Sequence, residues 1–277
     1  MGTVESLLGN ITNEEVAKEP FPHLTRCGAI SPEYYAQLER SFPSNTVVCG
    51  DRVPSHGNVA VRMSSAAVFA SRQISREWKD FFQYHISEDY WRDLVRVFGQ
   101  AIRSIYPRLE ERLGRPLEDF RVGVRGNSGP ADVKLECQFV VNPPGMMMEA
   151  IKTPHVDKRQ TLIAGLFYLR DHEDDTEGGH LELYRWNRSP RFLPYRMILA
   201  KDVTHCATSH YSANQFVCFV NSPSSVHGVS PRHPGSLSRR YINLVAEVPH
   251  HLFRLPLISL PAAVGNWNAI REIRRSK

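Results

Sequence analysis

The chain has 277 residues, with 34 basic and 29 acidic side chains, a net charge of +5 and a pI near 9.0. This length is sufficient for one large β-domain with a full hydrophobic core, and we expect a single domain. The charges are scattered, and no basic run with interleaved aromatic residues marks a nucleic-acid surface. A nucleic-acid partner is therefore not expected, whereas the positive balance leaves room for an anionic small-molecule ligand.

The cysteines and the apolar runs bear on the cellular compartment. The five cysteines are an odd number at irregular spacing, which favours free thiols in a reducing compartment. The longest apolar run, residues 161–169, is about half of a membrane span. No basic amino-terminal start is followed by an apolar stretch. We expect a cytoplasmic protein without a membrane partner, and the sequence leaves its oligomeric state open.

The first 119 residues are predicted to be rich in helices. Ser87 is suited to cap a helix, acidic residues follow it, and apolar residues then repeat at helical spacing until Pro107. Such a helix has one apolar face to bury. The aromatic residues before it, Trp78, Phe81 and Phe82, are expected to pack against a sheet.

The pattern changes at Phe120 to short β-branched and aromatic runs separated by turn residues, among them Gly178-Gly179. These runs predict a mainly β fold with amino-terminal helices, whose core is a sandwich or jelly roll over residues 120–248. Residues 249–277 form a carboxyl-terminal extension, with a basic helix expected over 266–275. The predicted strands are 120–124, 133–142, 161–169, 180–186, 197–200, 215–220 and 240–248.

Two histidines and one aspartate form a metal-binding pattern. His155 and Asp157 precede the apolar run at 161–169, and His227 follows later in the core. Residues at i and i+2 of a strand project from the same face, so we expect His155 and Asp157 to open a strand and to bind one ion together. Two histidines and a carboxylate are typical of non-haem Fe(II) oxygenases. A competing pair with the same spacing, His172 and Asp174, lies in a hydrophilic stretch that predicts a solvated loop.

The segment 137–248 resembles the core of the Fe(II)/2-oxoglutarate-dependent dioxygenases, and most of all their prolyl-hydroxylase and phytanoyl-hydroxylase relatives. The matching motifs occur in the family's order. They are Gln138 to Gly145, His155-Val156-Asp157, Thr161 to Leu169, Glu177 to Leu183, His227 to Pro231, and Arg240-Tyr241.

This resemblance implies a double-stranded β-helix (a cupin-like jelly roll) in which His155, Asp157 and His227 are the catalytic Fe(II) ligands. It also implies 2-oxoglutarate as co-substrate, O2 as oxidant and succinate as a product. The aspartate favours hydroxylation, because halogenating relatives replace this carboxylate by a small residue.

The far carboxylate of 2-oxoglutarate needs a buried cation, for which a guanidinium is well suited. Arg239 and Arg240 are adjacent and must point to opposite faces of their strand. Arg240 shares its face with Ile242 and Leu244, and we expect this more apolar face to be the barrel interior. Arg240 is therefore the first choice and Arg239 the second.

Further candidates for the co-substrate pocket are Gln138, Asn142 and Thr161. Two positions depart from the family: Asn142 stands where many prolyl-hydroxylase relatives have a tyrosine that binds the co-substrate, and Ile242 replaces a small polar residue.

Three functions remain open on the sequence. The first is hydroxylation of an unactivated C–H bond in a small molecule, such as a free, N-substituted or carrier-tethered amino acid or a related metabolite. The second is hydroxylation of a protein or nucleic-acid side chain. The third is a metal-containing binding module without turnover. Candidate anchors for an anionic substrate are Arg52, Arg62 and Arg159.

Overall fold

The computed structural model describes residues 4–50, 59–144 and 149–257. The helix expected over 266–275, and Arg52, lie outside the described residues.

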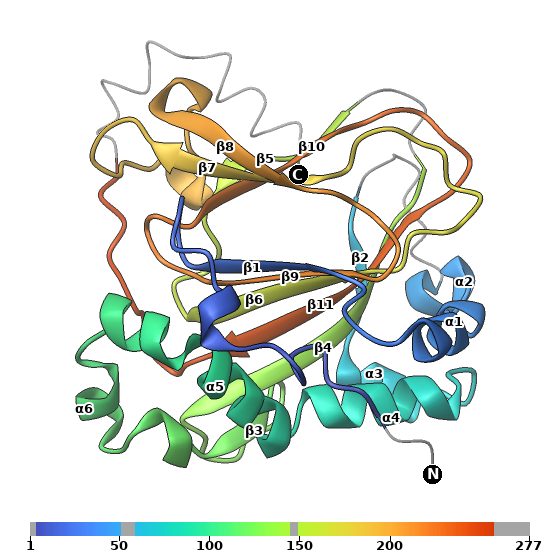
Figure 1. The fold of residues 1–277 in the computed structure, drawn as a ribbon, viewed down its shortest axis with the longest axis horizontal. Helices are drawn as coiled ribbons and strands as arrows, with labels where there is room; N and C mark the ends of the chain where they lie inside the picture. The colour runs from blue at the N-terminus through green and yellow to red at the C-terminus, as the bar shows by residue number, and fades with distance from the viewer. Residues whose placement is uncertain (1–3, 51–58, 145–148, 258–277) are drawn as a thin grey trace.

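Within these residues, eleven strands form two sheets that face each other (Figure 1). The larger sheet has the order β1-β9-β6-β11-β4-β2, with β3 beside β4, and the smaller has the order β5-β10-β7-β8. This pair of facing sheets is the predicted jelly roll. The strands are β1 (His23–Cys27), β2 (Val61–Met63), β3 (Val122–Val124), β4 (Val133–Asn142), β5 (Glu149–His155), β6 (Thr161–Tyr168), β7 (Leu181–Trp186), β8 (Val203–Ser209), β9 (Gln215–Val220), β10 (Val226–Arg232) and β11 (Arg239–Glu247).

The helices are concentrated in the first 120 residues, as predicted. The Ser87 side chain accepts a hydrogen bond from the backbone N–H of Tyr90, and the helix it caps ends at Ile105, before Pro107. The α-helices are α1 (Pro32–Arg40), α2 (Asn45–Cys49), α3 (Ser65–Ala70), α4 (Arg76–His85), α5 (Glu88–Ile105) and α6 (Leu109–Leu113); short 3-10 helices are η1 (Asn13–Glu15), η2 (Leu117–Asp119), η3 (Pro194–Arg196) and η4 (Ala200–Asp202).

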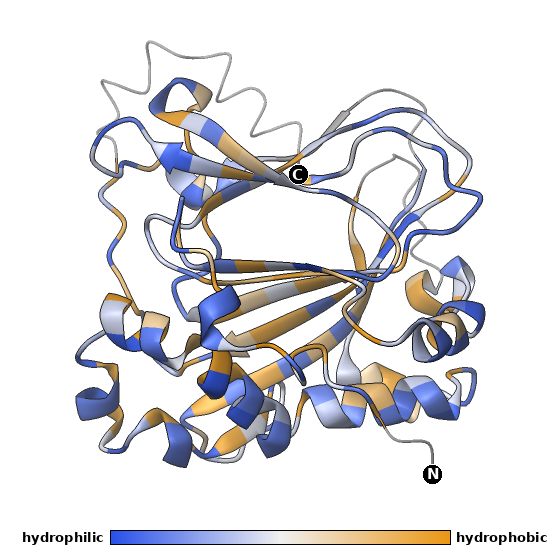
Figure 2. Cartoon of the chain, in the orientation of Figure 1, coloured by the Kyte–Doolittle hydropathy of each residue, from blue (hydrophilic) through white to orange (hydrophobic). Residues whose placement is uncertain are grey.

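Helices cover the face of the larger sheet that points away from the smaller sheet (Figure 1). The sheet strands are strongly hydrophobic there, and the helices turn their hydrophilic side outward (Figure 2). Trp78 of α4 is fully buried, and its ring centroid lies 4.8 Å from that of Phe139 on β4. Phe81 and Phe82 belong to the same cluster, which confirms that the aromatic residues of α4 pack on the sheet.

The space between the two sheets contains a second, more aromatic cluster. Tyr168 and Tyr241 of the larger sheet meet Leu181 and Leu183 of the smaller sheet there. This interior is the inner face of the larger sheet, and the helix-covered side is its outer face.

The predicted strands agree with the structure in most of the core. The expected bounds of β4 and β9 are those observed, and Gly178 and Gly179 form the expected turn with positive φ values of 87° and 75°. The strand predicted over 197–200 was wrong: Met197 forms only an isolated bridge to His155, and a 3-10 helix begins at Ala200. The helix-rich part also contributes two strands, β1 and β2, to the larger sheet.

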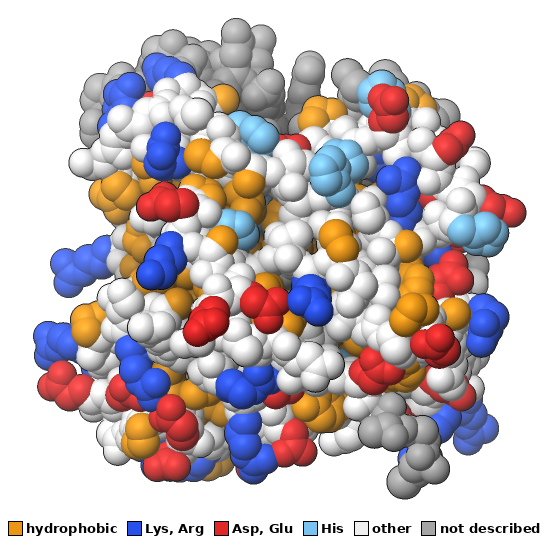
Figure 3. Space-filling model, in the orientation of Figure 1, with side chains coloured by type: hydrophobic (Ala, Val, Ile, Leu, Met, Phe, Trp, Pro, Cys, Tyr) orange, Lys and Arg blue, Asp and Glu red, His pale blue; other side chains and the backbone are white. Residues whose placement is uncertain are grey.

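Other sequence expectations concern thiols, membranes and charge. All five cysteines are free, and burial raises the pKa of the Cys137 and Cys218 thiols. None of the helices within the described ranges is long and apolar enough to cross a membrane. Figure 3 shows acidic and basic side chains interspersed over the helical half of one face. Charge on this face is scattered, as the sequence indicates.

Candidate metal centre

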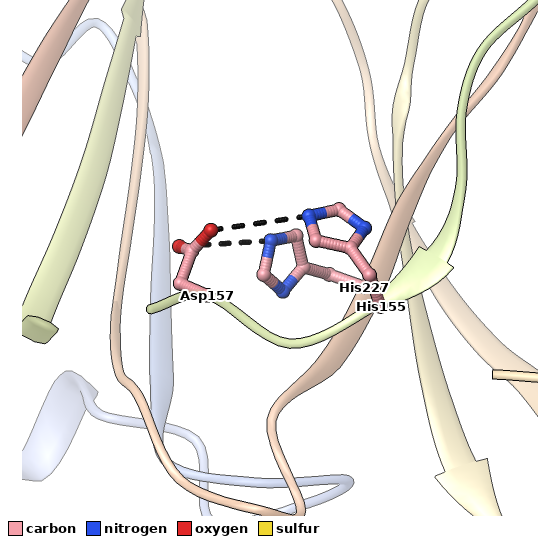
Figure 4. Close-up of side chains that lie close together, drawn as sticks. All are labelled: His155, Asp157 and His227. Carbon is pink, nitrogen blue, oxygen red and sulfur yellow. Dashed lines mark ion pairs between the residues drawn. The ribbon is translucent and has the colours of Figure 1, made fainter. Parts of the chain in front are cut away.

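His155, Asp157 and His227 converge in the structure. The Nε2 atom of His155 lies 3.9 Å from Asp157 Oδ1, and the Nε2 atom of His227 lies 3.8 Å from Asp157 Oδ2. The potential ligand atoms all lie within 4.8 Å of one another, and Figure 4 shows the carboxylate facing both rings. Both histidines are buried, whereas the Asp157 side chain is 26% exposed. The arrangement resembles one triangular face of a coordination sphere.

The elements that position the three residues differ from the sequence prediction. His155 is the last residue of β5, and Asp157 lies in the loop that follows, so the expected strand containing both was wrong. His227 lies opposite His155 in the register of β5 with β10. The pairing of two strands therefore brings the histidines together, and a turn of the chain directs the carboxylate towards them.

Backbone carbonyl groups orient both imidazoles. The Nδ1 atom of His155 lies 2.9 Å from the Thr153 carbonyl, and that of His227 lies 2.9 Å from the Ser225 carbonyl. A carbonyl can only accept, so each Nδ1 carries a proton, and Nε2 is the ring nitrogen turned towards Asp157. Metal-bound histidines are commonly fixed in this way.

Asn221, at the end of β9, ties the loop of Asp157 to the turn before His227. Its Oδ1 accepts hydrogen bonds from the Asp157 backbone N–H and the Ser225 hydroxyl, and its Nδ2 donates to the carbonyls of Lys158 and Thr161. The side chain is fully buried. Asn221 was not predicted, because one asparagine after an apolar strand carries no signal of long-range hydrogen bonding.

The competing pair does not form an alternative centre. The His172 side chain is 82% exposed, and buried Asp174 is bound instead by Arg232. A group of Glu39, Asp171 and His172 does bring potential ligand atoms together. However, Arg240 already bridges its two carboxylates, at 3.5 Å from Glu39 and 3.1 Å from Asp171.

The structure overturns the predicted direction of Arg240. Its guanidinium pairs with Asp171 and Glu39 and lies over the Phe42 ring, on the outer face. Ile242 and Leu244 also pack on this helix-covered side. The apolar face of β11 thus points to the helices, and Arg239 is the arginine that enters the interior.

Arg239 is 1% exposed and is surrounded by aromatic rings. Its Nε donates to the Gly179 carbonyl, and its Nη2 donates to the Tyr168 hydroxyl at 3.2 Å. The rings of Tyr168, Tyr211 and Tyr241 lie 5.1, 5.2 and 4.6 Å from the guanidinium carbon. Within the described residues, no carboxylate forms an ion pair with Arg239.

Arg232 is a second buried arginine, and a carboxylate neutralises its charge. It is 2% exposed, and its Nη2 donates to both carboxylate oxygens of Asp174, at 2.9 and 2.8 Å. Burying an unpaired charge costs several kcal/mol. Among the described residues, Arg239 thus differs from Arg232 in having no carboxylate that neutralises its charge.

The other predicted pocket residues have mixed surroundings. Asn142 is fully buried and lies opposite Arg239 in the register of β4 with β11. Gln138 accepts a hydrogen bond from Asn243, and the backbone carbonyl of Thr161 accepts one from Asn221. Their contacts with a co-substrate stay predictions. Tyr168, which contacts Arg239, was not predicted because it resembles an ordinary core aromatic.

The donor set suits a divalent iron ion. Two neutral imidazole nitrogens and one carboxylate oxygen can bind one face of an octahedral ion and leave positions for other ligands. In both rings a backbone carbonyl group fixes the orientation, and this supplies the rigidity that such a centre needs.

Comparison with known proteins gives a family match. Residues 147–245 match the model of the 2OG-Fe(II) oxygenase superfamily, a range that includes all three converging residues and Arg239. A comparison with curated proteins found no match.

Solved structures with a similar arrangement include hydroxylases and a dioxygenase. A Pseudomonas putida prolyl-4-hydroxylase is 12% identical with a TM-score of 0.42, over 82% of this chain and 93% of that chain. A Trichoplax adhaerens prolyl hydroxylase, solved with a hypoxia-inducible-factor peptide, is 13% identical with a TM-score of 0.42, over 82% and 83%. A rice dioxygenase for auxin oxidation is 13% identical with a TM-score of 0.42, over 80% and 72%.

The jelly roll, the converging triad and the family match over the core agree with one another. Over residues 147–245 the chain is similar to the 2OG-Fe(II) oxygenase superfamily, whose members use Fe(II), 2-oxoglutarate and O2.

Proposed function

We propose that the protein hydroxylates an unactivated C–H bond of a small molecule while 2-oxoglutarate is converted to succinate and carbon dioxide. In this proposal His155, Asp157 and His227 hold Fe(II). The side chains of Arg239 and Tyr168 hold the far carboxylate of 2-oxoglutarate.

The observation that carries the proposal is the buried Arg239, which has no carboxylate partner among the described residues. Arg239 is 1% exposed in an aromatic enclosure between the sheets, in the same interior that His227 enters through its contact with Phe219. A dicarboxylate co-substrate would bind metal with one end and neutralise Arg239 with the other. A jelly roll that only bound metal would have no need for this second charged site.

The bound Fe(II) supplies the oxidising chemistry with O2. The protein residues orient the reactants: carbonyl groups fix the histidine rings, and Asn221 fixes the carboxylate loop. The guanidinium of Arg239 sets the direction of the co-substrate. A small substrate is favoured because charges on the visible face are interspersed rather than gathered into a surface for a polyanion (Figure 3).

The test is substrate-dependent succinate formation over a metabolite library, compared between the wild type and His227→Ala. Removing one of the proposed ligands should abolish succinate formation and lower iron occupancy. His172→Ala is the matched control, because that histidine is 82% exposed and should leave both properties unchanged. Normal iron content and full turnover in His227→Ala would contradict the assignment, and loss in His172→Ala alone would favour the other motif.

A second variant tests the carboxylate. Asp157→Gly should lose hydroxylation but keep some affinity for a divalent metal, because the two histidines and the co-substrate still provide donors. Metal affinity is measured by calorimetry with Mn(II) in place of iron. Hydroxylation at the wild-type rate would exclude Asp157 as a ligand.

A further inference from the structure

A basic cavity borders the loop that carries Asp157. Its volume is about 570 Å³, and its polar lining includes Lys158, Arg159, Arg196 and His251. Pro194 and Leu255 contribute apolar walls, and none of the lining residues is acidic. We call this cavity the loop pocket.

The loop pocket is distinct from the interior site of Arg239. Val156, between His155 and Asp157, packs with Phe192 and Leu255 in a cluster apart from the one between the sheets. Lys158 is the next residue after Asp157, and the Nε of Arg196 donates to the Val156 carbonyl at 3.2 Å. The pocket therefore borders the loop that carries Asp157, and none of its lining residues belongs to the cluster around Arg239.

Among the described residues, the neighbouring acids are paired with other cations. Asp202 is engaged by Arg191 and Arg188, and Glu247, which lines an adjacent cavity with Lys158, faces Arg125. Within the part of the chain that the structure describes, no carboxylate forms an ion pair with Lys158, Arg159 or Arg196. Cations gathered in a concave site raise the local concentration of anions.

The backbone of Arg196, which lines the cavity, has an unusual conformation. Its φ is 66°, a left-handed conformation that residues other than glycine seldom adopt. The conformation is held by the Val156 N–H, which donates to the Arg196 carbonyl, and by Arg196 Nε, which donates to the Val156 carbonyl. Such backbone conformations in non-glycine residues cluster at ligand-binding sites.

We propose that the loop pocket binds the phosphate group of a small molecule, with its cationic residues holding the oxyanion and its apolar wall contacting the rest of the ligand. A phosphate presents the oxygens and the high charge density that arginine and lysine donors bind best. The volume is that of an ordinary small-molecule site. This inference does not depend on iron or 2-oxoglutarate binding.

The test is calorimetric titration of inorganic pyrophosphate into the full chain. We expect saturable binding to one site, and a loss of at least about tenfold in affinity for Lys158→Ala/Arg159→Ala, since both side chains line the cavity and neither forms an ion pair with a described carboxylate. Arg185→Ala removes the same type of charge from an exposed position of β7 and should change affinity less than twofold. Thermal unfolding shows whether each variant is folded.

Two further variants separate this pocket from the co-substrate site. Arg239→Ala should bind pyrophosphate as the wild type does, and His227→Ala should do the same even if it proves inactive. Non-saturable binding, an equal loss in Arg185→Ala, or unchanged affinity in folded Lys158→Ala/Arg159→Ala would overturn the proposal. Loss of pyrophosphate binding only in Arg239→Ala would also overturn it, because the probe would then occupy the interior.

Discussion

The two faces of the larger sheet have opposite chemistry. On the outer face, Phe139 and Ile242 are fully buried beneath helices in an apolar cluster. On the inner face, Tyr168 and Tyr241 surround the guanidinium of Arg239. The outer face stabilises the fold through burial of apolar area. The inner face contains a buried charge and hydroxyl groups, which in our proposal bind 2-oxoglutarate. The proposal thus assigns stability and binding to different sides of the same strands.

The largest expected effect is on the outer face. Trp78→Ala should lower the free energy of unfolding by roughly 3–5 kcal/mol, since it leaves a large cavity. The indole is fully buried, contacts Phe139, and its N–H donates to the Leu38 carbonyl. Chemical denaturation measures this loss.

The same variant should bind 2-oxoglutarate normally in its folded fraction. Titration below the unfolding transition checks this expectation. A large loss of affinity without a loss of stability would show that the two faces are not separate in function.

The next effect compares adjacent residues on opposite faces. Arg239→Ala should weaken 2-oxoglutarate binding by about ten- to a hundredfold, because a charged hydrogen bond contributes roughly 1.5–3 kcal/mol. Arg240→Ala should change this affinity less than about twofold and lower stability slightly, since its ion pairs lie on the outer face. Calorimetry with Mn(II) in place of iron measures both variants, and a loss confined to Arg240→Ala would reverse the assignment of faces.

The orientation of these arginines marks a limit of sequence reasoning. A rule that places the more apolar face inside works when the other face meets water. Both faces of β11 are covered, one by helices and one by the smaller sheet, so neither face is exposed to water. The more polar face of β11 is therefore not the solvent face; it is the face that we propose binds the co-substrate. The alternation of Arg239 and Arg240 was predictable, but the side that each one faces depends on the helices.

Strand prediction depended on how apolar each strand is: it succeeded for apolar strands and failed for polar edge strands. β4 and β9 are continuous apolar runs between turn residues, and their bounds follow from the sequence. β5 and β8 are the edge strands of the smaller sheet, and their sequences are polar or contain proline, as with Pro154. The motif of His155, Asp157 and His227 identified the triad, although the strand that carries His155 was missed.

A smaller effect is expected where the two sheets meet. Asn221→Ala should weaken Mn(II) binding by about tenfold, the lower end of what residues supporting metal ligands contribute. The change removes the acceptor of the Asp157 backbone N–H and the donor to two loop carbonyls. Asn221→Asp retains the acceptor and should recover part of the affinity, measured by calorimetry. Equal affinity in Asn221→Ala and the wild type would show that the loop keeps its position without this side chain.

The smallest effect concerns one hydroxyl on the inner face. The Tyr168 oxygen accepts from Arg239, and burial raises the pKa of Tyr168 to about 12, so the hydroxyl keeps its proton at neutral pH and can donate it to a bound carboxylate. Tyr168→Phe should weaken 2-oxoglutarate binding by about two- to tenfold, the equivalent of one neutral hydrogen bond of roughly 0.5–1.5 kcal/mol. Tyr211→Phe is the control, because that hydroxyl accepts from the Arg240 backbone N–H and its loss should reduce stability rather than affinity. Between pH 7 and 9 the difference between wild type and Tyr168→Phe should stay constant, since the hydroxyl does not titrate there. A difference that disappeared over this range would mean that the hydroxyl loses its proton far below 12 and that the inner face is less enclosed than its aromatic lining indicates.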